Sequence, residues 1–134
     1  MIDLFAGPGG LAEGFSTLKF GKNRKFDIKL SIEKDVSAHS TLLRRSFCRP
    51  FPINQLPKEY YNAIQCNNIE QREKKIQELF DLYPFQHEQA SREAVLFELG
   101  KDSETNLDQR IKDSLGSDTN WVLIGGPPCQ AYSM

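Results

Sequence analysis

The sequence predicts an α/β domain with a parallel sheet, and three stretches of the chain carry that prediction. An apolar strand at residues 2–6 runs into a glycine-rich turn and a helix. A second strand ends at the acidic residue Glu33, and a third apolar run at 121–124 ends at Gly125. Strands that alternate with helical patterns are typical of parallel sheets, which bind ligands beyond the carboxyl ends of their strands. We therefore expect a ligand site where these three strands end.

The first strand leads into Gly7-Pro8-Gly9-Gly10, a turn that only glycines make so tightly. Apolar residues then repeat with helical spacing over residues 11–19. This order places free backbone N–H groups and a positive helix end beside the strand terminus, which suits the polar part of a nucleotide-like ligand. The pattern Gly7-x-Gly9-x-x-Ala12 also fits the loose dinucleotide fingerprint, which does not identify the ligand by itself.

The second strand, at residues 26–32, is followed by Glu33-Lys34-Asp35, and Glu33 lies 23 residues after Gly10. An acid at this position commonly holds a ribose, because an ionised carboxylate accepts hydrogen bonds from both vicinal hydroxyls. Alternatively, these acids cap the next helix, with Asp35 as the N-cap. Both roles are compatible, so we expect Glu33 to contact the ligand and Asp35 to open a helix that runs to about Phe47.

The third strand precedes a cysteine. The run from Trp121 to Ile124 has no polar interruption, as in a strand buried on both faces of a parallel sheet. Pro127 and Pro128 fix two φ angles and remove two backbone donors, so the loop that presents Cys129 is stiff. An isolated cysteine is more often a small buried hydrophobe. This rigid lead-in and the polar residues that follow favour an exposed nucleophile instead.

Residues 49–116 are polar and mostly helical in pattern. Their apolar residues form three stripes that we expect to be core faces: Ile69, Ile76, Leu79 and Phe80; then Ala90, Ala94, Val95, Phe97 and Leu99; then Leu107, Ile111 and Leu115. The segment is therefore predicted to be a helical insert within a domain that spans 1–134. His39 and His87 have no partner at ligand spacing, and a structural role is expected for both.

Composition limits the classes of protein. The 134 residues, with 17 Lys and Arg against 18 Asp and Glu, have a net charge of −1, so whole-chain charge gives no argument for nucleic acid. Three cysteines without a Cys-x-x-Cys pair argue against a disulfide framework or a metal site and for a reducing compartment. No apolar stretch approaches the roughly 20 residues of a membrane span. We expect a cytoplasmic protein without metal, and both chain ends suggest a piece of a longer one.

Three stretches together closely resemble the cytosine-5 DNA methyltransferase family, in that family's order. They are Asp-Leu-Phe-Ala-Gly-Pro-Gly-Gly at 3–10, Glu-Lys-Asp at 33–35, and Gly-Gly-Pro-Pro-Cys-Gln-Ala-Tyr-Ser at 125–133. The resemblance implies part of a Rossmann-like methyltransferase fold that binds S-adenosyl-L-methionine, with the helical insert between the second strand and the cysteine-loop strand. It also implies DNA as the partner, at a cytosine flipped out of the duplex, in a system of the restriction-modification type.

The resemblance further implies roles for individual residues. Phe5 would lie against the adenine of the cofactor, and Gly7, Gly9 and Gly10 would line its pocket toward the methionine end. Glu33 would hold the ribose hydroxyls, and the alkyl stem of Lys34 would cover the adenine, where the family usually has an apolar or aromatic residue. Cys129 would be the nucleophile, with Pro128 as the rigid residue before it. Asp108, 21 residues before Cys129, is the candidate for a further cofactor-contacting acid, with Asp102 as an alternative.

The sequence departs from the family where DNA is read. The family's Glu-Asn-Val stretch, its Arg-x-Arg segment and its target-recognition region are absent from these residues. A C-terminal part or a complementing polypeptide is therefore an expected partner. Three alternatives stay open: the same chemistry on tRNA, a non-catalytic cofactor-binding or split-enzyme fragment, and a nicotinamide-dependent oxidoreductase. The glycine turn permits the last, but the Pro-Pro-Cys-Gln loop does not fit it.

Overall fold

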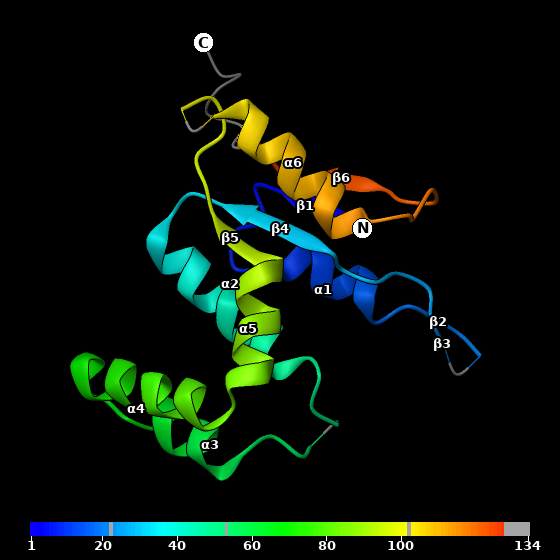
Figure 1. Ribbon diagram of the computed structural model, residues 1–134. Helices are drawn as coiled ribbons and strands as arrows, with labels where there is room; N and C mark the ends of the chain where they lie inside the picture. Colours follow the sequence, from blue (N-terminus) through cyan, green and yellow to red (C-terminus); the bar gives the residue numbers. More distant parts are fainter. Residues whose placement is uncertain (22, 53, 102, 128–134) are drawn as a thin grey trace.

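The structure is a computed structural model that describes residues 1–127 except 22, 53 and 102, and the backbone alone of Glu104. Its centre is a four-stranded parallel sheet with the strand order β5-β4-β1-β6 (Figure 1). The strands are β1 (Ile2–Leu4), β4 (Leu30–Glu33), β5 (Ala94–Leu96) and β6 (Leu123–Gly125). The chain starts in the middle of the sheet, adds β4 and β5 on one side, and returns to add β6 on the other. The order therefore reverses between β1 and β6, where such sheets bind ligands.

Helices cover both faces of this sheet. On one face, Ile2, Leu30 and Ile32 pack with β5 and with the apolar side of α6 (Glu104–Leu115). On the other face lie α1 (Gly10–Ser16), whose Ala12 packs with Met1 and Ile28, and α2 (Val36–Cys48), which packs on Ala94. This two-sided covering explains why β1 and β4 read as buried strands.

The first two helices begin as the sequence predicts. Gly9, at φ 86°, precedes α1, and Asp35 caps α2 by accepting a hydrogen bond from the Ala38 N–H at 2.8 Å. That bond satisfies one of the free amides of the first turn. The Asp35 prediction is confirmed. Between α1 and β4 the chain adds a small antiparallel hairpin of β2 (Lys19–Phe20) and β3 (Asn23–Arg24).

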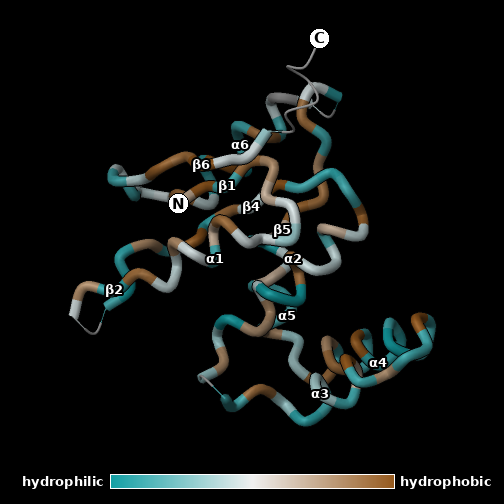
Figure 2. Tube along the Cα trace, turned by 180° about the vertical axis from the view of Figure 1, so that it is seen from behind, coloured by the Kyte–Doolittle hydropathy of each residue, from teal (hydrophilic) through white to brown (hydrophobic). Residues whose placement is uncertain are grey.

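A second core lies on the far side of α2 from the sheet. It is built by α3 (Lys58–Ile64), α4 (Ile69–Leu82) and α5 (Pro84–Glu93). Figure 2 shows hydrophobic and hydrophilic residues alternating along α4, as expected for a helix with one buried side. Phe47 of α2 is fully buried against that side, and Ile76, Leu79 and Phe80 surround it.

The structure corrects the prediction that the apolar stripe from Ala90 to Leu99 is helical. Residues 94–96 form β5, which pairs in parallel with β4 in the register Ile32↔Val95. The sequence pattern joined Ala90 to Leu99 as one helical stripe, because a short apolar run does not by itself distinguish a strand from a buried helical turn. Of residues 49–116, α3 and α4 lie away from the sheet, whereas β5 and α6 belong to the central α/β unit (Figure 1).

The prediction that the last strand is buried on both faces is also wrong. Within the described residues β6 pairs only with β1, and Leu123 is 51% exposed. Trp121 and Val122 precede the strand and are also partly exposed. A continuous apolar run predicts burial only if both faces and both edges of the strand are covered. No helix in the described part of the chain has the length and apolar character that a membrane span requires.

Candidate cofactor site

A cavity of about 320 Å³ lies at the carboxyl ends of the parallel strands. All four strands contribute to it, because each strand ends or is followed by a residue of its wall. The described residues that line it are Phe5, Gly7, Ile32, Glu33, Lys34, Phe97, Leu99 and Gly126. The structure thus brings together four residues that the sequence predicted to bind a cofactor: Phe5, Gly7, Glu33 and Lys34.

The turn after β1 has a strained backbone at the cavity. Phe5 has φ 57° and Gly7 has φ 56°. The left-handed region is unfavourable for a bulky residue such as phenylalanine and persists only where neighbouring contacts hold it. Two backbone bonds do so here, from Ala6 N to Ile32 O and from Gly9 N to Ala6 O, both at 2.9 Å. The conformation leaves the Phe5 ring 40% exposed at the cavity.

The Glu33 carboxylate joins the ends of two strands. Its Oε2 accepts a hydrogen bond from Gly7 N at 2.6 Å. Its Oε1 accepts from Lys34 N at 2.9 Å and from Asp35 N at 2.7 Å. An ionised carboxylate has about four acceptor positions, so one stays free for a ligand hydroxyl while the other three fix the group in place. Glu33 is therefore both a structural link and an oriented acceptor in the cavity wall.

Lys34 extends over the cavity from the end of β4. Its ammonium lies 3.7 Å from Glu98 Oε1, and Lys101 Nζ lies 3.2 Å from Glu98 Oε2. A lysine held at its charged end can lay its alkyl stem along an apolar surface. The stem of Lys34 can therefore cover a flat ligand ring while its charge stays in solvent.

Three apolar wall residues were missed by the sequence analysis: Ile32, Phe97 and Leu99. Phe97 follows β5 and its N–H donates to Glu33 O at 2.9 Å, which sets it beside the carboxylate. It was overlooked because β5 was interpreted as part of a helix. Once β5 is assigned as a strand, the residue after it belongs to the same edge of the sheet as Phe5 and Glu33.

Other predicted site residues lie elsewhere. Gly9 and Gly10 are not among the described residues of the cavity wall; a Cβ at Gly9 would lie 2.8 Å from Leu42 Cδ1, so Gly9 permits the close approach of α2. Asp108 is exposed on α6 and also does not line the cavity. Asp102, Pro128 and Cys129 lie outside the described residues.

Asp3 is fully buried beneath the glycine turn. In the sheet register it stands beside Ser31, and neither carboxylate oxygen nor the Ser31 hydroxyl has a partner in good hydrogen-bond geometry. Burial raises the pKa of Asp3 from 3.8 to about 6; the nearby Ala12 amide opposes the rise and the charge of Glu33 adds to it. The glycine turn therefore lies above a buried acid whose neutral form the fold favours.

The cavity fits a nucleoside-like group. Phe5, Phe97 and Leu99 offer apolar surface for a base, and the fixed carboxylate of Glu33 offers an acceptor for ribose hydroxyls. Its volume lies at the lower end of the range for small-molecule sites, about 300–1,000 Å³. Among the described residues there is no group of three or more His, Cys, Asp or Glu side chains that could hold a metal ion.

Comparison with known proteins gives one relevant similarity. The chain matches no protein-family model. No solved structure matches it either. It is similar to the Type II methyltransferase M.Bpa9945I of Bacillus paralicheniformis, with 31% identity over 148 aligned residues that include the whole chain. The chain spans 31% of that protein's length. This similarity supports a methyltransferase family, and the parallel sheet is compatible with a Rossmann-like methyltransferase fold.

Proposed function

We propose that this chain forms the cofactor-binding part of a DNA (cytosine-5) methyltransferase of the restriction-modification type, with S-adenosyl-L-methionine as its cofactor. The observation that carries the proposal is the cavity at the carboxyl ends of the strands, where Phe5 and Gly7 of the turn after β1 meet Glu33 at the end of β4. The similarity to a Type II methyltransferase supports the same reaction class. The residues from 125 to 133 that resemble the cysteine loop of the family give the proposed base, cytosine.

The cavity residues would bind and orient the cofactor. The free acceptor position of Glu33 accepts a hydrogen bond from a ribose hydroxyl, Phe5 and Phe97 contact the adenine, and the Lys34 stem covers it. When bound, the cofactor supplies an electrophilic methyl group on a sulfonium. Because three backbone amides already fix the Glu33 carboxylate, the ribose meets an acceptor that needs no reordering, which reduces the entropic cost of binding.

The proposed role of Cys129 follows from the chemistry of cytosine. Carbon 5 of the ring is too weak a nucleophile to accept a methyl group, so a thiolate adds at carbon 6 and raises the electron density at carbon 5. Carbon 5 would then take the methyl group that the cofactor supplies, with the carbon–sulfur bond of the sulfonium breaking. Loss of the carbon 5 proton to a base and expulsion of the thiolate would restore the ring. The base has to leave the duplex to be reached. Gly126 lines the cavity, and Cys129 follows it by three residues in the chain.

Cofactor binding is tested first, on this chain alone. Isothermal calorimetry with S-adenosylhomocysteine and, separately, with NAD should show binding of the first and none of the second. Thermal stabilisation by S-adenosylhomocysteine alone would agree, because a ligand that binds only the folded state raises its stability. Binding of NAD in its place would overturn the proposal in favour of an oxidoreductase.

The base and the polymer are tested on the whole protein that contains these residues, with cofactor added. A 5-fluorocytosine duplex should give a covalent adduct seen in the intact mass, and Cys129→Ala should give none. Methyl transfer to matched DNA and tRNA substrates distinguishes the two polymers. Cofactor binding without any adduct would instead indicate a non-catalytic or complementing subunit.

A further inference from the structure

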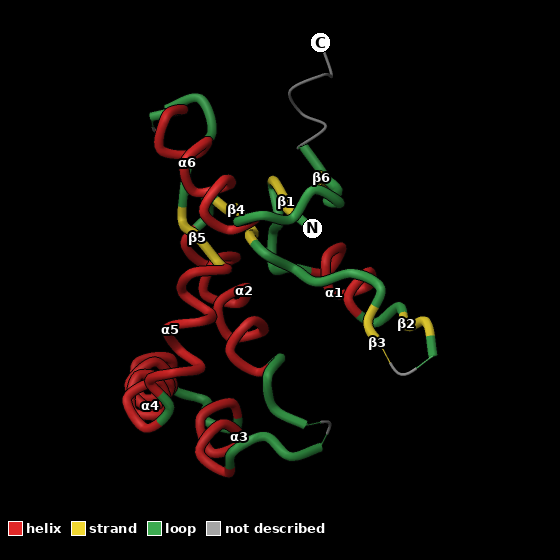
Figure 3. Tube along the Cα trace, turned by 45° about the vertical axis from the view of Figure 1, so that its right-hand side comes forward, coloured by secondary structure: helices red, strands yellow, loops and turns green. Residues whose placement is uncertain are grey.

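A basic segment connects α1 to β4. Residues 14–26 contain Lys or Arg at four positions and no Asp or Glu, although the whole chain has a net charge of −1. Within it, residues 19–20 and 23–24 pair as the β2–β3 hairpin, which projects from the body of the molecule beyond the end of α1 (Figure 3). We call Lys19, Phe20, Arg24 and Lys25 the basic hairpin. A surface of this kind attracts polyanions through local charge.

The pairing within the hairpin places like charges together. Lys19 stands directly opposite Arg24, and Phe20 stands opposite Asn23. Opposed residues of an antiparallel pair lie on the same face, and like charges in that position destabilise it. None of Lys19, Arg24 and Lys25 forms an ion pair within the part of the chain that the structure describes. The hairpin therefore lacks anionic partners of its own, and a bound anion would relieve the repulsion.

The hairpin also presents an aromatic ring. Phe20 is 85% exposed, more than any other large hydrophobic residue described as exposed. A single exposed apolar residue is common on protein surfaces. Phe20 lies on the strand that carries Lys19, but on the opposite face, because successive side chains of a strand alternate between its two faces. Phe20 is therefore an uncharged position in the hairpin, apart from the face that carries Lys19 and Arg24.

The positive surface continues onto α2. Arg24 lines a cavity of about 390 Å³ together with Arg45, Phe51 and Tyr60. Arg45 is exposed and has no ion pair among the described residues. The acid in this cavity, Glu13, is already paired, since its Oε2 lies 3.0 Å from Arg49 Nη2. Two unpaired arginines from separate elements therefore face one hollow.

We propose that the basic hairpin, with Arg45, is a second contact surface for duplex DNA that binds backbone phosphates. The inference rests on the proposed function, in which DNA is the substrate. The hairpin follows the end of α1 and precedes the start of β4, so it lies at the edge of the sheet opposite the cofactor cavity and would contact duplex away from the target base. Lys and Arg contacts to phosphates carry affinity without reading the base sequence.

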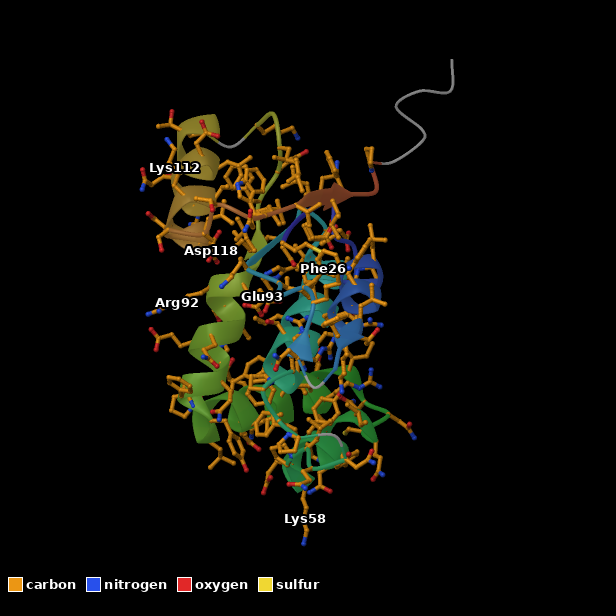
Figure 4. The ribbon with its side chains drawn as sticks, turned by 90° about the vertical axis from the view of Figure 1, so that its right-hand side faces the viewer. Phe26, Lys58, Arg92, Glu93, Lys112 and Asp118 are labelled. Atoms are coloured by element: carbon orange, nitrogen blue, oxygen red, sulfur yellow. The ribbon has the colours of Figure 1, made fainter. Side chains whose placement is uncertain are left out.

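The test compares two triple variants of the whole protein that contains these residues, on a random-sequence duplex at several salt concentrations. Lys19→Gln, Arg24→Gln and Lys25→Gln together should weaken binding. They should also lower the slope of log Kd against log salt by about 0.9 for each phosphate that the variant no longer neutralises, up to about 3. The control neutralises Lys58, Lys74 and Lys112, which are exposed and unpaired among the described residues. Figure 4 shows Lys58 and Lys112 at opposite ends of the molecule.

Phe20→Ala is an uncharged control within the same hairpin. It should leave both the affinity for duplex DNA and the salt slope unchanged, because it removes no cation and the bases of a duplex are not free to stack on the ring. Equal affinity and slope in the two triple variants would overturn the inference. The inference would also be overturned if the hairpin triple variant bound DNA normally and lost binding only to an acidic polypeptide. Every variant should bind S-adenosylhomocysteine as the unmodified protein does, which separates this test from that of the proposed function. The proposed function fails if the unmodified protein binds no S-adenosylhomocysteine.

Discussion

The carboxylate of Glu33 links three backbone amides from two strand ends, so its charge shapes the site before any ligand binds. Gly7 belongs to the turn after β1, whereas Lys34 and Asp35 follow β4. Hydrogen bonds to an ionised group are stronger than those between neutral groups. A change at Glu33 therefore alters both the turn and the acceptor that it offers to a ligand.

Glu33→Gln should weaken S-adenosylhomocysteine binding by about 10- to 100-fold, because a hydrogen bond to a charged group contributes about 1.5–3 kcal/mol. Calorimetry measures the affinity. Asp108→Asn removes the same charge from an exposed position on α6 and should leave the affinity unchanged. Equal losses in both variants would exclude this cavity as the cofactor site.

Asp3 gives the protein a predicted dependence on pH. Its pKa is about 6 in the fold against 3.8 ordinarily, so the folded state binds the proton more tightly than the unfolded state does. The stability that this adds is fully present below about pH 3.8 and is lost as the pH rises through about 6. The loss is about 2–3 kcal/mol as an upper bound, since one pKa unit corresponds to 1.36 kcal/mol.

Urea unfolding of the unmodified chain and of Asp3→Asn, at pH values from about 4 to 7.5, measures this effect. Relative to Asp3→Asn, the unmodified chain should lose stability across that range. Other titrating groups are present in both proteins and cancel in the comparison. Parallel stability profiles would show that Asp3 ionises normally in the fold.

At the scale of elements, Gly125 sets the distance between β6 and β1. A Cβ at this position would lie 2.4 Å from Leu4 O, closer than any real side chain comes to a backbone oxygen. Leu4 and Gly125 are register partners in the sheet. The first glycine of the Gly-Gly-Pro-Pro lead-in is therefore required by strand packing, whatever the role of the loop that follows.

Gly125→Ala should lower the free energy of unfolding by about 1–3 kcal/mol, because the added methyl group pushes β6 away from β1. Gly126→Ala is the matched control, since a Cβ there meets nothing within 4 Å and its φ is not positive. Thermal unfolding by circular dichroism compares the two. A Gly125→Ala variant that is as stable as the unmodified chain would mean that the two strands can separate slightly at no cost.

Arg49 connects three elements through a buried ion network. From the end of α2 its guanidinium pairs with Glu93 of α5 and, at 3.0 Å, with Glu13 of α1. Arg49→Met should destabilise the chain by about 3–5 kcal/mol, because removing one partner leaves a buried charge without compensation. Chemical denaturation measures the loss.

Adding Glu93→Leu to Arg49→Met should restore much of that stability, since apolar replacement of a whole buried pair is often neutral. Burial already raises the pKa of Glu93, against the influence of Arg49. The single variant should therefore be least stable at high pH, where Glu93 is charged. An additive double variant would show that the two side chains are not coupled.

At the scale of the whole molecule, the cofactor cavity joins segments far apart in sequence, whereas α3 and α4 lie on the other side of α2 (Figure 1). Binding of S-adenosylhomocysteine should therefore slow hydrogen–deuterium exchange at residues 5–7, 33–35 and 97–99 together. Residues 58–82 should exchange at the same rate with and without ligand. Protection confined to 58–82 would place the ligand in the wrong part of the molecule.

Local chemistry allowed several features to be predicted from the sequence. The strand, glycine turn and helix at the start of the chain, the Asp35 cap and the position of Glu33 at a strand end all depend on neighbours within a few residues. Apolar patterning did not predict the strand at Ala94–Leu96, because this short apolar run becomes a strand only by pairing with β4. It also failed at β6, whose apolar residues are partly exposed.

The sequence alone determined the local elements and the resemblance of the glycine turn, Glu33 and the cysteine loop to a methyltransferase. Only the tertiary structure decided that Phe97 and Leu99 complete the cavity, that Asp108 does not line it, and that a basic hairpin projects beside α1. The reason is physical. Hydrogen bonding and periodicity act over a few residues, whereas a cavity wall, a buried acid and a charged surface arise from segments that meet only when the sheet assembles.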